Sequence, residues 1–205
     1  MDIFDAIRHD PHNVPDMIEE DEFDDLEAED RLGNSPLHIA VEQGEREIII
    51  ALMEAGVNPD IRNDEGMAPI HVAASMVEPG LLKVLGENGA DIDAKDANGM
   101  TALHYAAGSE KDCVDVLLAL GADTSVKDAE GMTPLHHAML DNNAARDMDG
   151  IVKTLVAHGA DIHAKDNDGD TPYDFVKFRE IQGLKAPERE DAKPLKQRAE
   201  VSLDC

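Results

Sequence analysis

Histidine is the residue in this 205-residue chain with the most obvious capacity for acid–base chemistry or metal binding. Four of the nine histidines stand at one position of a recurring six-residue phrase: His38, His71, His104 and His136. Three of these four have a Ser or Thr three residues earlier, which can serve as a hydrogen-bond partner. A residue that recurs at one position of a repeat usually serves the repeat itself. We therefore interpret these four histidines as structural.

The other patterns that suggest metal chemistry are incomplete. The pairs His136-His137 and His158-x₄-His163 lack cysteines and a third ligand at a useful spacing. The acidic turn around Gly169 is similar to a calcium loop, but Ala164 and Phe175 stand where that loop needs acidic ligands. Motifs for phosphate binding, dinucleotide binding, serine hydrolysis and zinc proteolysis are absent from the sequence. We predict no catalytic residue, no metal site and no cofactor, and hence no enzyme.

The elements that carry these residues are short and repeated. Turn glycines follow one another at spacings of 33, 33, 32 and 38 residues: Gly33, Gly66, Gly99, Gly131 and Gly169. The copy at 96–127 predicts a short helix from Thr101 and a second helix that ends at Gly121 and carries Cys113, Val114, Leu117 and Leu118 on one face. Two such helices cannot bury an apolar stripe alone, so the units must stack.

After each glycine comes a version of one phrase, such as Ser35-Pro36-Leu37-His38-Ile39-Ala40 or Thr133-Pro134-Leu135-His136-His137-Ala138. This phrase and the period near 33 residues resemble the ankyrin-repeat family over roughly residues 1–182. The resemblance implies an all-α ankyrin-repeat solenoid, in which stacked helix-turn-helix units are joined by β-hairpin-like loops. It also implies that the repeated histidine ties its turn to the neighbouring repeat by hydrogen bonds.

The repeats divide the chain into about four full units between two partial caps. The divisions that we predict are a degenerate acidic N-terminal cap (1–29), three regular repeats (30–62, 63–95 and 96–127), a repeat with an insertion at 140–150 (128–165), a C-terminal cap (166–182) and a polar, disordered tail (183–205). We expect the insertion to form a surface loop between the two helices of its repeat.

Acidic residues dominate the composition. The chain has 45 Asp and Glu against 18 Lys and Arg, a formal charge of −27, and Arg8 is the only Lys or Arg among residues 1–30. Such a field disfavours nucleic acid and anionic lipid, and it would steer a basic protein partner toward the chain. The alternative is that the charge serves solubility, or adaptation of the source organism to salt.

Cysteine usage and hydropathy favour a cytoplasmic, reducing compartment. Cys113 occupies a core position of its helix and Cys205 ends a polar stretch, so we do not expect a disulfide between them. The N-terminal residues lack the basic and long apolar regions of a signal peptide, and no run approaches the length of a membrane span.

The candidate binding surface follows from the resemblance, because ankyrin partners usually contact the hairpin tips and the exposed side of the first helices. The position after the turn glycine is Met67, Met100 and Met132 in three successive repeats, which predicts an exposed, adaptable apolar stripe. The alternative is that these methionines pack only on one another. Neighbouring positions add further candidates: Glu65, Asn98, Glu130, Met76, Ser109, Leu140 and Asp141.

These observations predict a monomeric, non-catalytic protein–protein interaction module, acting as an adaptor or regulator with a basic protein partner. They exclude nucleic acid and membrane as expected partners. Two alternatives stay open: a bacterial effector that acts on a host protein, and a regulatory subunit of an enzyme complex.

Overall fold

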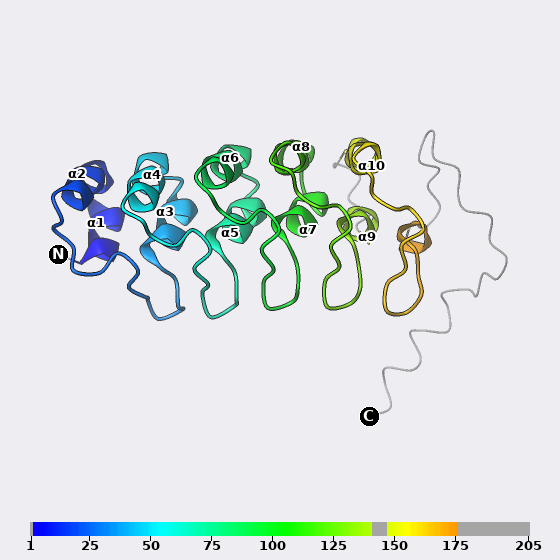
Figure 1. Ribbon diagram of the computed structural model, residues 1–205, viewed down its shortest axis with the longest axis horizontal. Coiled ribbons are helices and arrows are strands. Elements are labelled where there is room, and N and C mark those ends of the chain that lie inside the picture. Colours follow the sequence, from blue (N-terminus) through cyan, green and yellow to red (C-terminus); the bar gives the residue numbers. More distant parts are fainter. Residues whose placement is uncertain (1, 141–146, 176–205) are drawn as a thin grey trace, which may run out of the picture.

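The computed structural model describes residues 2–140 and 147–175 (Figure 1). Within those residues it has helices and turns and no strand. The helices are α1 (Ile3–His9), α2 (Val14–Glu19), α3 (Pro36–Gln43), α4 (Arg46–Glu54), α5 (Pro69–Ser75), α6 (Pro79–Glu87), α7 (Ala102–Ala107), α8 (Lys111–Ala119), α9 (Pro134–Leu140) and α10 (Met148–Ala157), with 3-10 helices η1 (Pro11–Asn13) and η2 (Pro172–Phe175).

The helices form two parallel rows (Figure 1). One row holds α1, α3, α5, α7 and α9, and the other holds α2, α4, α6, α8 and α10. The loops that precede the first-row helices project together on one side of the stack. Within a row each helix packs on the next, as α5 does on α7 and α7 on α9. The molecule is therefore an elongated stack held together by contacts between adjacent units.

The repeated histidine caps the start of the first helix in each full repeat, and at α3 the cap is reciprocal. At α3 the backbone N–H of His38 donates to Ser35 Oγ, and the N–H of Ser35 donates to His38 Nδ1 at 3.2 Å. Ala68 has no side-chain acceptor, yet its N–H still donates to His71 Nδ1 at 3.0 Å. The hydrogen bond to the histidine ring is therefore present at Ala68, where the bond to a hydroxyl is missing.

The core between the rows is aliphatic and repeats in register. Leu52, Leu85, Leu117 and Leu155 occupy equivalent positions of the second-row helices, and all four side chains are fully buried. Cys113 lies in the same core, where burial raises the pKa of its thiol to about 11. This thiol stays protonated at neutral pH and acts as a small apolar side chain.

The projecting loops are hairpins that bond to one another along the stack. Each hairpin closes on itself, as where Asp96 N–H donates to Met100 O at 2.9 Å. At three of the hairpins a cation at the base reaches the next hairpin: Lys95 Nζ donates to Lys127 O at 2.9 Å, and Lys127 Nζ donates to Lys165 O at 2.7 Å. Arg62 makes the equivalent bond to Lys95 O. These bonds fix the spacing of the hairpin tips.

Both ends of the range 140–150, where we expected a surface loop, belong to helices. Leu140 still belongs to α9, and α10 begins at Met148 because the Asp147 side chain caps it by accepting the Gly150 N–H at 2.9 Å. Residues 141–146 lie outside the described residues. The same holds for 176–182 of the expected C-terminal cap and for the 183–205 tail.

A central core leucine should matter more than its equivalent near an end. We expect Leu117→Ala to lower the free energy of unfolding by about 2–5 kcal/mol, because a fully buried leucine leaves a cavity between repeats. Leu155→Ala makes the same cavity nearer the end of the stack and should unfold fewer repeats. Urea unfolding followed by circular dichroism measures both. A loss below about 1 kcal/mol for Leu117→Ala would contradict this assignment of the core.

Candidate functional site

The four repeated histidines join neighbouring repeats. Each ring is fully buried. In each, Nδ1 accepts a backbone N–H from three residues earlier, as His104 Nδ1 does from Thr101 at 3.0 Å. Since a carbonyl can only accept, Nε2 is the protonated nitrogen. Nε2 of each histidine donates to a carbonyl at the hairpin tip of the next repeat. The bonds run from His38 to Met67 O (2.9 Å), from His71 to Met100 O (3.1 Å), from His104 to Met132 O (3.2 Å) and from His136 to Asp170 O (3.3 Å).

Burial keeps these rings neutral. It lowers the pKa of all four histidines, and for His104 burial and the nearby His137 lower the pKa to about 4. With both ring nitrogens engaged and the neutral form favoured, none of the four is placed to move a proton to or from a ligand. The geometry supports the structural interpretation.

One group of side chains has the composition of a metal site. His104, Asp128 and His137 each bring a ligand atom within 4.8 Å of the others. His104 cannot serve as a ligand in this arrangement, because its Nδ1 accepts the Thr101 amide and its Nε2 carries the proton donated to Met132 O. Two ligands remain, fewer than a closed zinc site uses. The expectation that the chain has no metal site stays a prediction, now with a physical reason at this place.

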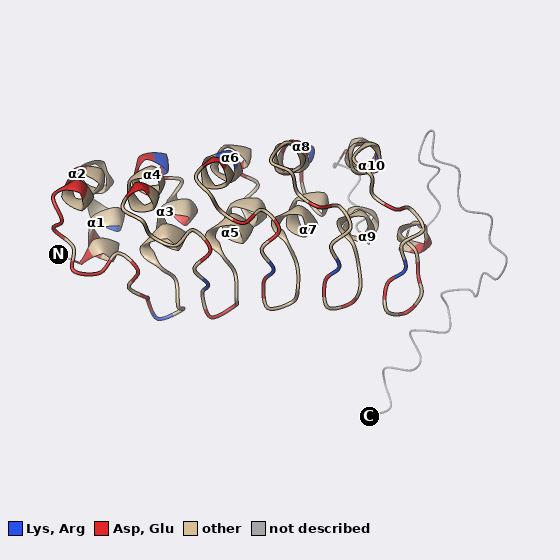
Figure 2. Ribbon diagram, in the orientation of Figure 1, with Lys and Arg blue, Asp and Glu red and all other residues tan. Residues whose placement is uncertain are grey.

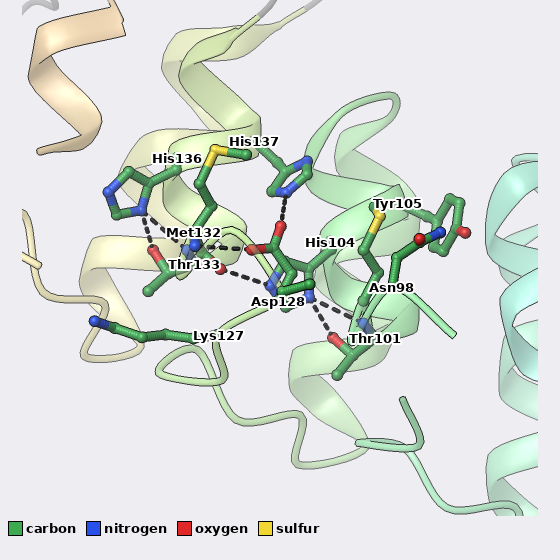
Figure 3. Close-up of polar contacts among 12 residues, drawn as sticks. Asn98, Thr101, His104, Tyr105, Lys127, Asp128, Met132, Thr133, His136 and His137 are labelled. Carbon is green, nitrogen blue, oxygen red and sulfur yellow. Dashed lines mark hydrogen bonds and ion pairs between the residues drawn. The ribbon is translucent and has the colours of Figure 1, made fainter. Parts of the chain in front are cut away.

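The residue after the repeated histidine makes a polar contact in two repeats, which the sequence analysis missed. Tyr105 Oη donates to Asp96 Oδ2 at 2.7 Å. His137 Nε2 donates to Asp128 Oδ2 at 2.6 Å (Figure 3). Burial and the Asp96 carboxylate raise the pKa of Tyr105, so its hydroxyl stays a donor. The variable residue between His and Ala in the repeated phrase was the available signal for these side chains.

These rings also stack edge to face on the repeated histidines. Tyr105 packs on His71 with ring centroids 6.2 Å apart, and His137 packs on His104 at 5.2 Å. Phe175 makes the equivalent contact with His136 at 6.0 Å. Successive rings on α7, α9 and η2 therefore each pack on the repeated histidine of the preceding repeat.

Met67, Met100 and Met132 are half-buried, so the expectation that they form an exposed stripe was wrong. The N–H groups of Met67, Met100 and Met132 donate to Asn63 Oδ1 at 3.0 Å, Asp96 Oδ1 at 2.8 Å and Asp128 Oδ1 at 2.8 Å. The histidines hold the carbonyls of the same three residues, so the tip backbone is fixed on both sides. Figure 3 shows this arrangement at Met132. Each side chain consequently lies partly against the stack and leaves only part of its surface to solvent.

The other candidate positions within the described residues fall into three classes. Glu65, Asn98 and Glu130 are exposed at the tips. Met76 and Leu140 are exposed apolar side chains at the ends of first-row helices, with exposed fractions of 40% and 42%. Ser109 is half-buried, and its Oγ donates to Tyr105 O at 3.0 Å. Asp141 lies outside the described residues.

A cleft brings three of the candidates together near the C-terminal end of the stack. It has a volume of about 340 Å³ and lies among α9, η2 and the last two hairpins. Its lining includes Glu130, Met132 and Leu140 from the candidates, together with Phe175. Met67 and Met100 do not line it.

Acidic side chains occur in every described repeat, whereas Lys and Arg are few and several lie at the hairpins (Figure 2). The hairpin cations Lys95 and Lys127 are engaged with carbonyls of the next hairpin. The potential over the stack is accordingly negative, as the net charge of −27 requires.

Comparison with known proteins identifies the class. The family model for ankyrin repeats (3 copies) matches residues 4–96 and 76–166, so the chain belongs to the ankyrin repeat family. The solved structure of EF0377, an ankyrin repeat protein, is 28% identical to this chain, covers 84% of it and 88% of its own length, and superposes with a TM-score of 0.75. No curated protein matches the chain.

Ankyrin repeats are generally protein–protein interaction modules, and their fold is typically non-catalytic. Among the described residues, no helix has both the length and the apolar character that crossing a membrane requires.

The buried histidines predict a loss of stability below neutral pH. Their pKa values lie below the ordinary value of about 6.5, so as pH falls the unfolded chain takes up protons first and becomes favoured. The contribution of the neutral histidines to the free energy of unfolding is complete above about pH 6.5. At pH 5 the loss of this free energy from His104 alone should be about 1–2 kcal/mol. Denaturant unfolding at pH 7.5 and pH 5 measures the effect.

A pair of variants isolates the histidine contribution from that of the carboxylates. His104→Asn should reduce the difference in stability between the two pH values, whereas His12→Asn, at an exposed position, should leave it unchanged. An equal pH dependence in both variants would contradict the prediction.

Proposed function

We propose that this chain is a non-catalytic adaptor or regulator that binds a protein partner as a monomer. The binding face consists of the hairpin tips and the exposed side of the first-row helices. The partner carries a basic surface. The membership of the ankyrin repeat family supports the general role, and the site geometry supports the choice of face.

One observation carries the choice of face: three methionines stand at one tip position on backbones held from both sides. Asn or Asp at the start of the repeat fixes each N–H, and the histidine of the preceding repeat fixes each carbonyl. The unbranched thioether side chains are then adaptable groups on a rigid frame. Such a surface can adjust to an irregular partner without losing the order of the backbone.

The charge of the chain supports the choice of partner. With a net charge of −27, a basic surface would be drawn toward the stack from beyond contact distance, and an acidic one would be repelled. The exposed acidic side chains of the first repeat extend this field to the N-terminal end.

Substitution of the central methionine tests the face. We expect Met100→Gln to weaken the complex by about 1 kcal/mol or more, because the change makes an apolar contact polar while keeping the length of the side chain. Met53→Gln is the matched control, since Met53 is also half-buried but lies in α4 of the other helix row. Calorimetry with the partner isolated on the full chain measures both. Equal affinities of the two variants would mean that the methionines at the tips only pack against the stack.

Neutralising the acidic cap tests the electrostatic part. Changing Asp16, Glu19, Glu20 and Glu22 to their amides should slow association and flatten its dependence on salt, with dissociation nearly unchanged. Surface plasmon resonance at several salt concentrations gives both rates. An association rate that responds neither to salt nor to these changes would leave the cap without a steering role.

A further inference from the structure

The cleft at the C-terminal end of the face is lined by apolar side chains, which we name its floor, and by carboxylates, which we name its rim. Met132, Leu140 and Phe175 form the apolar part. The carboxylates that line it are those of Glu130, Asp166, Asp168 and Asp170. A floor of this kind suits a long, partly apolar side chain, and the rim suits a positive charge at its end.

Comparison between repeats points to Asp166. It stands at the start of its repeat, where Asp96 and Asp128 stand in theirs, and its Oδ1 accepts the Asp170 N–H at 2.8 Å in the same way. In the two earlier repeats the other carboxylate oxygen also accepts a hydrogen bond, from Tyr105 or from His137.

At Asp166 this second donor is missing from the repeat. The equivalent ring is Phe175, which keeps the edge-to-face contact with the preceding histidine but has no polar hydrogen. Among residues 2–140 and 147–175, no side chain or backbone group donates to Asp166 Oδ2. A carboxylate oxygen whose counterparts are satisfied internally therefore borders the cleft.

We infer that this cleft binds an arginine side chain of the protein partner. The methylene stem lies on Met132 and Leu140, the guanidinium lies against the Phe175 ring, and its N–H groups donate to Asp166 Oδ2 and the rim carboxylates. Arginine fits better than lysine because its planar head pairs with a carboxylate through two bonds and also stacks on an aromatic ring. The inference rests on the proposed function and specifies one feature of the partner.

The first test needs no partner. N-acetyl-arginine methylamide is titrated into the full chain and followed by ¹H–¹⁵N NMR, with the neutral citrulline analogue as control. We expect saturable shifts confined to the amides around the cleft, such as those of Ala129, Glu130 and Asn167, and little response to citrulline. Lysine methylamide should bind more weakly than arginine.

Two variants make the test specific to the site. Phe175→Tyr keeps the ring and the charge of the site but supplies the hydroxyl that Tyr105 gives Asp96, so it should weaken arginine binding about threefold by occupying Asp166 Oδ2. Glu130→Gln should weaken binding by a similar factor, while Glu65→Gln, at the same tip position two repeats earlier, should not. Thermal melts establish that each variant is folded.

Several outcomes would overturn the inference. They are equal binding of citrulline, shifts spread over the acidic surface without saturation, and Phe175→Tyr binding as the wild type does. A further one is arginine binding that is absent in the wild type and is seen only in the double variant Lys177→Gln, Arg179→Gln. The occupant of the cleft would then be the chain's own C-terminal segment. Because the probe is a free arginine derivative, these results do not depend on the methionine substitutions that test the proposed face.

Discussion

The hydrogen bond from each buried histidine to the next hairpin is the interaction on which the rest of the structure depends. Aliphatic packing drives the helices together, but it is non-directional and does not by itself set where a hairpin tip lies. The histidine sets that position, because Nδ1 is held by the start of its own helix and Nε2 reaches a carbonyl in the following repeat. Each ring thereby converts helix stacking into a fixed spacing of the tips.

The same bond accounts for the character of the binding face. The carbonyl that receives it belongs to the tip residue, and the first residue of the repeat holds the N–H of that same tip residue. With its backbone fixed, the tip can vary in side chain without consequence for the fold. Met67, Met100 and Met132 stand at this tip position in one row. Their side chains lie partly against the stack and are half-buried.

The net negative charge destabilises the stack by repulsion, and hydrogen bonds and lysines offset this repulsion locally. Carboxylates at the repeat starts are placed where they accept hydrogen bonds: Asp96 from Tyr105 and Asp128 from His137. Lys95 and Lys127 lie between successive hairpins, where their positive charge also reduces repulsion. At Asp166 the pattern stops, because Phe175 keeps the ring and loses the donor. The end of the stack thus differs chemically from its centre, although the fold there follows the same repeat.

The sequence by itself determined the architecture. A glycine at intervals near 33 residues, a repeated helix start and helices too short to be stable alone leave stacking as the way to bury their apolar faces, and the structure has this stack. The sequence also indicated the role of the four histidines, because a residue repeated in register is explained by the repeat. It could not show that the methionines are half-buried, since exposure depends on how closely the hairpin folds against its neighbour.

Only the tertiary structure decided which side chains from different repeats meet. The pairing of Tyr105 with Asp96 spans nine residues within a repeat, but the packing of Tyr105 on His71 joins two repeats and depends on the rotation between them. The cleft of Met132, Leu140, Phe175 and Asp166 combines residues from two repeats in the same way. Periodicity in a sequence defines equivalent positions. Which of those positions face one another across the stack is set by the three-dimensional offset between units.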